Sequence, residues 1–144
     1  MRVAGAQQVA FGAVSETRFR FICVPSALAG APAGWAREML EEGEVALLAA
    51  EGLEAVDQLA HELDQRAIVL LRTEQTRELQ DQTVMAYAEA LPLVWVATAF
   101  SDAARIWARE RGPMTLLSEA TGPLGDEERR RIDRFLAILG RQSE

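Results

Sequence analysis

The stretch Leu93-Val94-Trp95-Val96-Ala97-Thr98-Ala99 is an uncharged, mostly apolar run that lies between two segments with helical spacing. Four further, almost uncharged runs occur along the chain, at Phe19–Val24, Val45–Ala50, Ala67–Leu71 and Met114–Leu117. Strands that read as continuous apolar residues are usually buried on both faces of a sheet. The pattern therefore predicts an α/β fold, a three-layer sandwich whose central, mostly parallel five-stranded sheet carries helices on both faces.

Helices are expected between these runs and after the last one. They are expected from Pro32 to Gly43, over Leu53–Leu63, over Thr76–Leu91, from Ser101 or Asp102 to Gly112, and from Asp126 to Gly140. Spacing predicts that the third of them buries Leu79, Thr83, Ala86, Tyr87 and Ala90.

The chain is predicted to be one domain over residues 1–144, because no linker or low-complexity tract interrupts it. Residues 1–24 are expected to be an N-terminal β extension, in which Val9–Val14 and Arg18–Val24 form an antiparallel hairpin that adds an edge strand. Residues 32–144 are expected to hold the β/α core and the C-terminal helix.

Composition excludes several classes of function. A net charge of −7 argues against broad binding to nucleic-acid phosphates or to anionic membranes. All fifteen basic residues are arginines, so the phosphate-loop lysine of nucleotide-binding proteins and the lysine of Schiff-base enzymes are absent. A single cysteine, Cys23, fits a reducing compartment, and a cytoplasmic protein from a bacterium with a GC-rich genome is expected.

Polar residues follow the predicted strands where they end. Ligands of open parallel α/β sheets gather at the carboxyl ends of the strands, near the point where the strand order reverses. The candidate residues for such a rim are Glu51, Arg72, Glu74, Thr98, Asp102 and Glu119. Carboxylates beside an arginine suit a divalent cation or a small polar ligand, although arginine–carboxylate pairs on solvated loops would give the same pattern.

Nucleophilic catalysis has few candidates in this chain. Cys23 lies inside an apolar strand, where a thiol is normally inert, and the single histidine, His61, has no partner in sequence to orient it. We therefore predict no catalytic residue, no metal site and no cofactor. Contacts with another protein or with a second copy are instead expected at Trp35, Trp107 and Phe135.

Residues 19–139 resemble the receiver domain of bacterial response regulators. The resemblance rests on the segment Glu38–Leu59, which runs from a helix through a strand into a glycine and a second helix, and on Val96–Asp102, which is similar to the receiver Thr-Ala turn. It implies a five-stranded α/β fold in which Thr98 matches the receiver threonine.

Other functional positions of the receiver family differ in this chain. Pro25-Ser26 stands where receivers carry an acidic pair, Arg72-Thr73 where they carry the phosphorylated aspartate, and Ser118-Glu119 where they carry a lysine. The resemblance therefore implies a pseudo-receiver that acts through protein contacts rather than through phosphotransfer.

A second resemblance, over about residues 35–119, is to Mrr-type restriction endonuclease domains. It rests on Phe100, Ala104, Ala108 and Leu116-Leu117, which have the family's spacing. The family's catalytic aspartate would match Asp57, in a segment of helical spacing where those enzymes need a strand. Its Gln/Glu-x-Lys strand would match Leu70-Leu71-Arg72, which lacks both the metal ligand and the lysine. This resemblance implies a scaffold that has lost nuclease activity.

These observations predict a non-catalytic regulatory or assembly module that acts through protein–protein contacts, as a homodimer or with another protein. The alternatives are the degenerate nuclease-like scaffold and a small-ligand or metal site at the carboxyl ends of the strands. Whether Leu53–Leu63 is a helix or a strand separates the two resemblances.

Overall fold

The computed structural model describes residues 2–3, 18–29, 31–32, 34–41, 43–63 and 68–142. Its sheet has six strands in the order β1-β4-β3-β2-β5-β6, and each pair of neighbours is parallel. The strands are β1 (Arg2–Val3), β2 (Phe19–Cys23), β3 (Gly43–Leu48), β4 (Val69–Leu71), β5 (Leu93–Ala97) and β6 (Thr115–Glu119). The predicted α/β class and the parallel sheet are confirmed.

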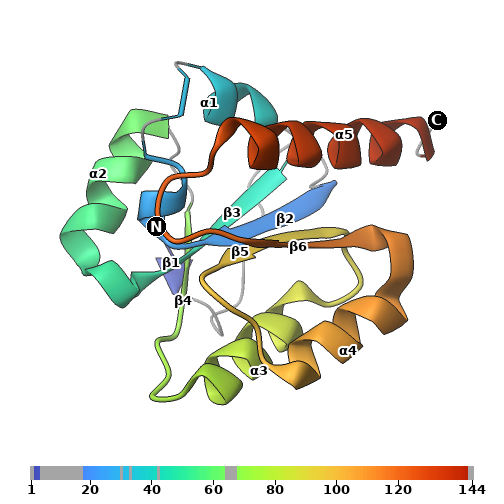
Figure 1. Cartoon of the computed structure of the whole chain (residues 1–144). Coiled ribbons are helices and arrows are strands. Elements are labelled where there is room, and N and C mark those ends of the chain that lie inside the picture. The colour runs from blue at the N-terminus through green and yellow to red at the C-terminus, as the bar shows by residue number, and fades with distance from the viewer. Residues whose placement is uncertain are drawn as a thin grey trace.

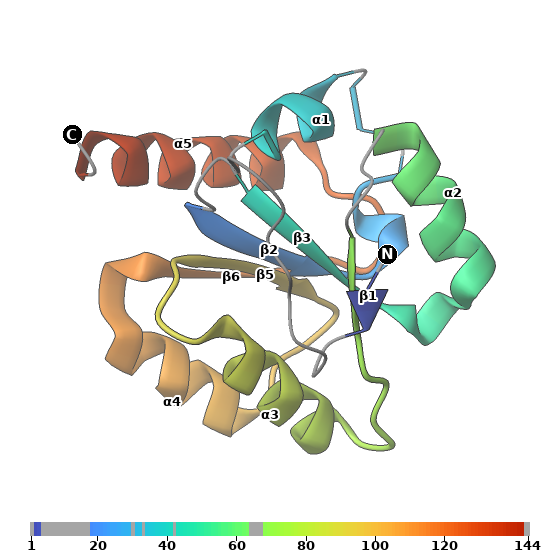
Figure 2. The ribbon, with the colours of Figure 1, turned by 180° about the vertical axis from the view of Figure 1, so that it is seen from behind.

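Five α-helices cover the two faces of the sheet, as Figure 1 and the reverse view in Figure 2 show. They are α1 (Trp35–Met39), α2 (Leu53–Leu63), α3 (Arg77–Ala88), α4 (Asp102–Arg111) and α5 (Asp126–Gln142), with short 3₁₀ turns at Pro25–Ala27, Ala49–Glu51 and Gly112–Met114. Helices α1, α2 and α5 lie on one face, and α3 and α4 lie on the other. The three-layer sandwich is therefore present.

Each face of the sheet has its own apolar core. On the side of α1, α2 and α5, the largest fully buried residues include Phe21, Val45, Leu47, Val56 and Ile132. On the side of α3 and α4, they include Ile22, Leu71, Val84, Leu93 and Trp95. Residues of β2 and β5 alternate between the two cores, which explains why these strands read as unbroken apolar runs.

The expected N-terminal hairpin is wrong in one respect. Strand β2 lies between β3 and β5, so both of its edges are already paired in parallel and no antiparallel partner can join it. Val9–Val14 lies outside the described residues. The edge strand at this end of the chain is β1, which pairs with β4, and the segment expected to belong to an extension supplies the central strand of the sheet.

The expected buried face of α3 is wrong in part. Thr83 and Tyr87 are half-buried, and Tyr87 packs on the core. Leu79 is 47% exposed and Ala86 and Ala90 are exposed, whereas Asp81, Val84 and Ala88 are the buried residues of the helix. The inward face therefore includes a charged residue, Asp81, which the apolar periodicity does not mark. At the C-terminal end of the chain, α5 continues through Gly140 to Gln142 rather than ending there.

Gly43 begins β3 rather than ending the first helix, and the ring of Phe19 lies against it. A Cβ atom at this position would collide with the ring carbons of Phe19, which is itself buried. We expect Gly43→Ala to lower the free energy of unfolding by about 1–3 kcal/mol, the usual cost of overpacking a filled site. Urea denaturation measures the loss, with Gly140→Ala as control, because nothing lies near a Cβ there. Equal losses in the two variants would contradict the prediction.

Within the described residues, no helix combines the length and the apolar character that are needed to cross a membrane.

Candidate functional site

The chain reverses direction across the sheet at β2. It passes from β2 to β3 and β4 on one side and then continues with β5 and β6 on the other side. The order of these five strands is therefore 3-2-1-4-5, that of the dinucleotide-binding doubly wound folds, and it differs from the flavodoxin-like order 2-1-3-4-5. In either arrangement, ligands bind at the carboxyl ends of the strands where the order reverses.

A crevice of about 610 Å³ lies at this point. Its lining includes Val24 and Ser26, which follow β2, and Ala97 and Thr98 at the end of β5. Apolar side chains, Leu48 among them, alternate around it with the polar side chains of the turns after β3 and β4. A cavity of this size with a few convergent polar groups is typical of a small-molecule site.

Three of the six predicted rim residues line this crevice: Glu51, Glu74 and Thr98. Glu51 ends the 3₁₀ turn after β3, and its Oε1 accepts a hydrogen bond of 2.9 Å from the backbone N–H of Ser26. The Glu51 carboxylate thus already accepts the hydrogen bond of the Ser26 N–H, which lies just after β2, the first strand of the doubly wound unit. In nucleotide-binding folds, the first strand–helix turn presents such donors to phosphate.

Glu74 is held by a small network at the end of β4. Its Oε1 accepts a bond of 2.5 Å from Arg72 Nε and one of 3.0 Å from the Thr83 hydroxyl. Its backbone N–H donates to Gln80 Oε1, and Gln80 Nε2 donates to the carbonyl of Arg72, both at 2.9 Å. The side chain of Arg72 is 73% exposed and lies outside the crevice, so this rim arginine serves to orient Glu74.

Arg72→Gln is expected to raise the pKa of Glu74. Hydrogen bonds from the Arg72 guanidinium and then from the Thr83 hydroxyl hold this pKa below its ordinary value. Because the folded-state pKa is lowered, the associated stability is present above the unfolded-state pKa and is lost as pH falls through the folded value. Carboxyl ¹³C NMR titration measures the change, with Arg37→Gln on α1 as control. A Glu74 titration that is identical in wild type and Arg72→Gln would contradict it.

The other two rim residues do not join the crevice. Asp102 is exposed in the first turn of α4, where its charge favours the helix N-terminus. Glu119 pairs with Arg105 of α4 and lines two hollows next to β6, of about 420 and 360 Å³, and the larger of these also includes Thr98. Sequence order alone could not separate these positions, because β6 lies at the edge of the sheet, away from β3 and β4.

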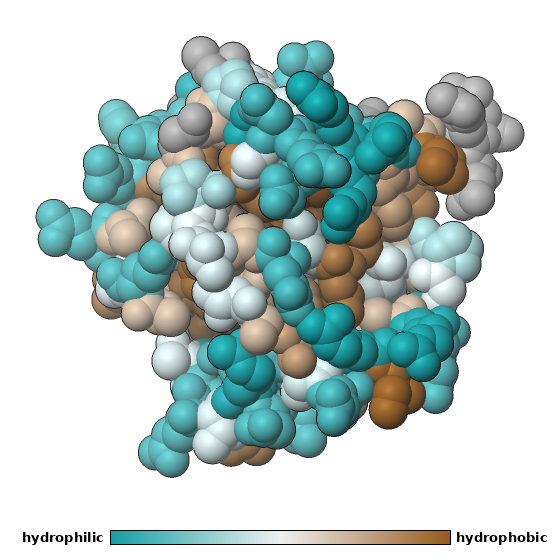
Figure 3. All heavy atoms as spheres, in the orientation of Figure 1, coloured by the Kyte–Doolittle hydropathy of each residue, from teal (hydrophilic) through white to brown (hydrophobic). Residues whose placement is uncertain are grey.

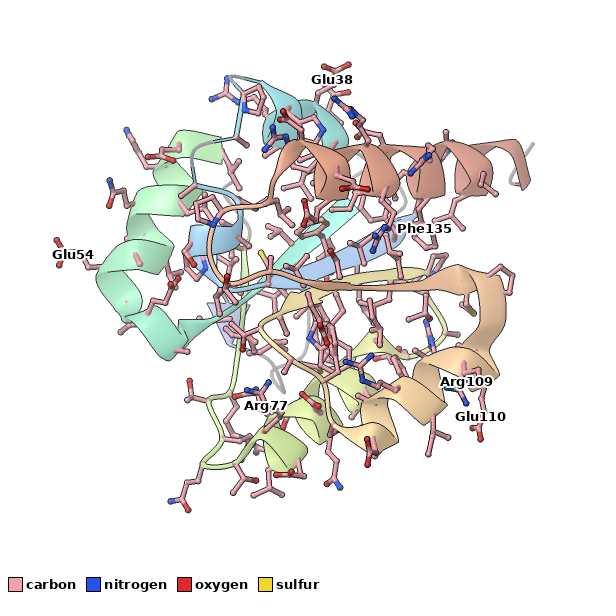
Figure 4. The ribbon with its side chains drawn as sticks, viewed as in Figure 1. Glu38, Glu54, Arg77, Arg109, Glu110 and Phe135 are labelled. Atoms are coloured by element: carbon pink, nitrogen blue, oxygen red, sulfur yellow. The ribbon has the colours of Figure 1, made fainter. Side chains whose placement is uncertain are left out.

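Helix α3 contributes lining residues that sequence reasoning missed. Asp81 is buried, and its Oδ2 accepts a bond of 2.8 Å from the backbone N–H of Ser101, which ties α3 to the turn after β5. Arg77 lies near the same turn, and its Nη1 donates to the carbonyl of Ala99 at 2.7 Å (Figure 4). The sequence did hold a signal for this inward position: Asp81 is spaced at helical intervals from the apolar residues Val84 and Ala88, so it lies on the same face of α3.

The charge of the crevice is unbalanced. Its lining residues include three carboxylates, those of Glu51, Glu74 and Asp81, and one cation, Arg77, which is bonded to a backbone carbonyl. The described residues hold no group of three or more histidine, cysteine or acidic side chains placed to bind a metal ion. The arrangement therefore suits a ligand that brings its own positive charge and hydrogen-bond donors.

Neither of the two residues considered as nucleophile or base, Cys23 and His61, lines the crevice. Cys23 is a buried free thiol, and burial, with a smaller contribution from Glu51, raises its pKa far above the ordinary range. A thiol in this state stays protonated and unreactive. His61 is exposed on α2 and does not line the crevice.

The three predicted contact residues are all half-buried. Trp35 Nε1 donates to Asp133 of α5 at 3.0 Å, and both residues line a hollow of about 670 Å³ at the amino ends of the strands. The ring of Trp107 packs edge-on against Trp95, with Arg111 over its face. Phe135 packs on the core beneath α5 (Figure 4). Trp35 and Trp107 thus join helices to the rest of the fold.

Comparison with protein-family models, with curated proteins and with solved structures finds no match to the chain, so the geometry of the crevice carries the functional argument alone.

Proposed function

We propose that this chain is a non-catalytic regulatory module that binds a small, cationic ligand in the crevice at the strand reversal. The observation that carries the proposal is the presence of Glu51, Glu74 and Asp81 in the lining of one crevice. Among its described lining residues, Arg77 is the single cation, and it donates to the carbonyl of Ala99. A ligand with an amino group and additional hydrogen-bond donors would complement these carboxylates.

A phosphorylated ligand fits this crevice poorly. The backbone N–H of Ser26, which is placed as a phosphate donor would be, is bonded to Glu51 Oε1 at 2.9 Å. A phosphate at this point would have to displace that carboxylate and would then meet the remaining acids of the lining. Strand order alone would suggest a nucleotide, so Glu51 is the residue that argues for an amine instead.

The regulatory role is supported by what the crevice offers chemically. Its polar groups are carboxylates, amides, hydroxyls and the Arg77 guanidinium, and the thiol of Cys23, which does not line it, is held protonated by burial. We propose that the module acts through protein contacts, as the receiver resemblance implies, although receivers have the strand order 2-1-3-4-5 and this sheet has 3-2-1-4-5. The buried free thiol supports a reducing compartment such as the bacterial cytoplasm.

The nuclease-like alternative loses its main support. Asp57, which would be the catalytic aspartate, lies on α2 and is exposed, whereas the family places that residue on a strand. Leu70 occupies the metal-ligand position on β4.

Thermal unfolding with a panel of small amines tests the proposal. Diamines, amino sugars and amino-acid amides are compared at constant ionic strength with inorganic phosphate and nucleoside phosphates. An amine at about one hundred times its Kd should stabilise the protein by about 2.7 kcal/mol, seen as a higher Tm. Shifts with phosphates alone, or with no compound, would overturn the proposal.

Matched variants separate crevice binding from general attraction to an acidic protein. Glu51→Gln and Glu74→Gln should each weaken binding of the active amine at least tenfold. Glu54→Gln removes the same charge from the exposed outer side of α2, where Glu54 points away from the molecule (Figure 4), and should leave binding unchanged. Equal affinity in all three variants would show that the amine binds elsewhere.

A further inference from the structure

Strand β6 forms an open edge of the sheet. In the described sheet its single neighbour is β5, and its other side faces outward between α4 and α5. Natural proteins usually protect such an edge with charges, prolines, bulges or a covering segment. The sequence of β6 is Thr-Leu-Leu-Ser-Glu, which contains no proline and carries its single charge at the last residue.

Apolar side chains remain partly exposed along this edge. Leu116 and Leu117 are half-buried, one in each core, whereas Leu93, Val94, Trp95 and Val96 of the neighbouring strand are fully buried. On the flanking helices, Ile106 of α4 and Ile138 of α5 are 52% and 51% exposed. Figure 3 shows apolar surface below α5 on this face, bordered by hydrophilic side chains.

The two ends of β6 carry opposite charges, so the strand is complementary to an antiparallel copy of itself. Near its first residue, Arg111 Nε donates to Thr115 Oγ1 at 2.6 Å, and its Nη atoms donate to the carbonyls of Glu89 and Leu91, so this end of the strand carries a guanidinium. At its last residue, Glu119 carries a carboxylate that is half exposed. Thr115, Leu117 and Glu119 lie on the α4 face of the strand. Thr115 and Glu119 are bonded to Arg111 and Arg105 of α4, and Leu117 packs on the core beneath that helix.

We propose that a second copy of this chain pairs with β6 in antiparallel orientation, about a two-fold axis at Leu117. In this register, Thr115 faces the partner's Glu119, Leu117 faces the partner's Leu117, and Leu116 faces the partner's Ser118. The basic end of each strand then meets the acidic end of the other, and each exposed backbone group of the edge gains a partner. The two sheets join into one continuous sheet.

The same axis brings α4 beside the α4 of the second copy. A two-fold axis perpendicular to the sheet keeps each helix layer on its own side and reverses its direction. Asp102 at the start of α4 then lies toward the partner's Arg109 near its end, and Ile106 lies close to the middle of the helix. Arg109 and Glu110 project outward from α4 in Figure 4, free of the core. In the helix layer, as in the strand, the acidic end of one copy therefore faces the basic end of the other.

Sedimentation equilibrium of the full chain tests the proposal, and a dimer is expected. Glu119→Arg places like charges beside Arg111 of the partner and should weaken the dimer at least tenfold. Glu78→Arg makes the same charge change at an exposed position of α3, remote from β6, and should leave the dimer intact. A wild-type monomer at every concentration, or a dimer that Glu119→Arg does not weaken, would overturn the proposal.

A cysteine cross-link tests the register directly. Residues opposite each other in an antiparallel pair have Cβ atoms about 4.5–5.5 Å apart, close enough for a disulfide after a small shift. Leu117→Cys should therefore cross-link two copies rapidly with oxidised glutathione. Glu54→Cys, on the outer side of α2 and remote from β6, should not, and buried Cys23 should stay reduced. Circular dichroism confirms folding of each variant, and absence of a Leu117→Cys dimer in folded protein contradicts the register. Amine binding is measured separately, so failure of the dimer leaves the proposed ligand site standing.

Discussion

Arg20→Met is expected to lower the free energy of unfolding by about 3–5 kcal/mol, as removal of one partner from a buried ion pair usually does. Arg20 lies on the central strand β2 and is buried. Its Nε is 3.1 Å from Glu44 Oε1, and its Nη1 donates to the carbonyl of Ala88 at 3.0 Å. The variant removes the Arg20 guanidinium from the buried Glu44 carboxylate, and it removes a side-chain donor from the carbonyls of Tyr87 and Ala88 at the end of α3.

Tyr87 makes this cluster more sensitive still. Its hydroxyl donates to Glu44 Oε1, and the guanidinium of Arg20 lies 4.5 Å from the centre of its ring. Burial, and then the hydrogen bond to Glu44, raise the pKa of Tyr87, so its hydroxyl stays protonated and remains a donor at neutral pH. Three residues from β2, β3 and α3 thus depend on one another for their partners.

Urea denaturation measures the effect of Arg20→Met against a matched control. Arg72→Met also removes an arginine from an ion pair with a glutamate, but the Arg72 side chain is 73% exposed. Exposed pairs contribute about 0–1 kcal/mol, so this variant should unfold close to wild type. A loss below about 1 kcal/mol for Arg20→Met would show that the buried cluster does not contribute as inferred.

Trp95→Ala is expected to cost about 3–5 kcal/mol, as truncation of a buried aromatic residue usually does. Trp95 is 1% exposed on β5 and is the largest fully buried side chain. Its ring packs edge-on against Phe100 and Trp107, with centroid distances of 4.9 and 6.3 Å. Removing it leaves a cavity beneath α3 and α4, and both helices lose their main contact with the sheet.

Two variants make this result specific. Trp107→Ala removes the same side chain from the same core, but Trp107 is half-buried, so its loss should be clearly smaller. Trp95→Phe should also cost less than Trp95→Ala, because it keeps a ring in place and removes an indole N–H that has no partner among the described residues. Thermal unfolding followed by near-ultraviolet circular dichroism compares the three. Equal losses for Trp95→Ala and Trp107→Ala would contradict the prediction.

The strands could be predicted because their signal is local. A central strand of a parallel sheet is apolar on both faces, so β5 reads as an unbroken apolar run, and β2 and β3 do so apart from Arg20 and Glu44. Helix α2 was predicted with its observed bounds for a similar reason, since Val56, Leu59 and Leu63 repeat at helical spacing. The Thr76 and Ser101 caps also follow from single residues that accept bonds three positions on.

The errors arose where a residue's surroundings come from distant parts of the chain. Gly43 was assigned to a helix end because glycine often terminates helices, whereas the ring of Phe19 on the neighbouring strand requires it. Asp81 was not recognised as inward-facing because its partner, the backbone N–H of Ser101, is twenty residues away. The Arg20–Glu44–Tyr87 cluster was missed because it joins three separate elements.

The amino-acid sequence by itself determined the α/β class, the parallel sheet and most helix bounds, because burial and periodicity act within a few consecutive residues. Only the tertiary structure decided the strand order. With it came the finding that Glu51, Glu74 and Thr98 line one crevice, that Asp102 does not, and that Glu119 meets Thr98 in a neighbouring hollow. The physical reason is that strand order depends on how helices pack across the whole sheet. Residues far apart in the chain become neighbours through that packing, and no local pattern records it.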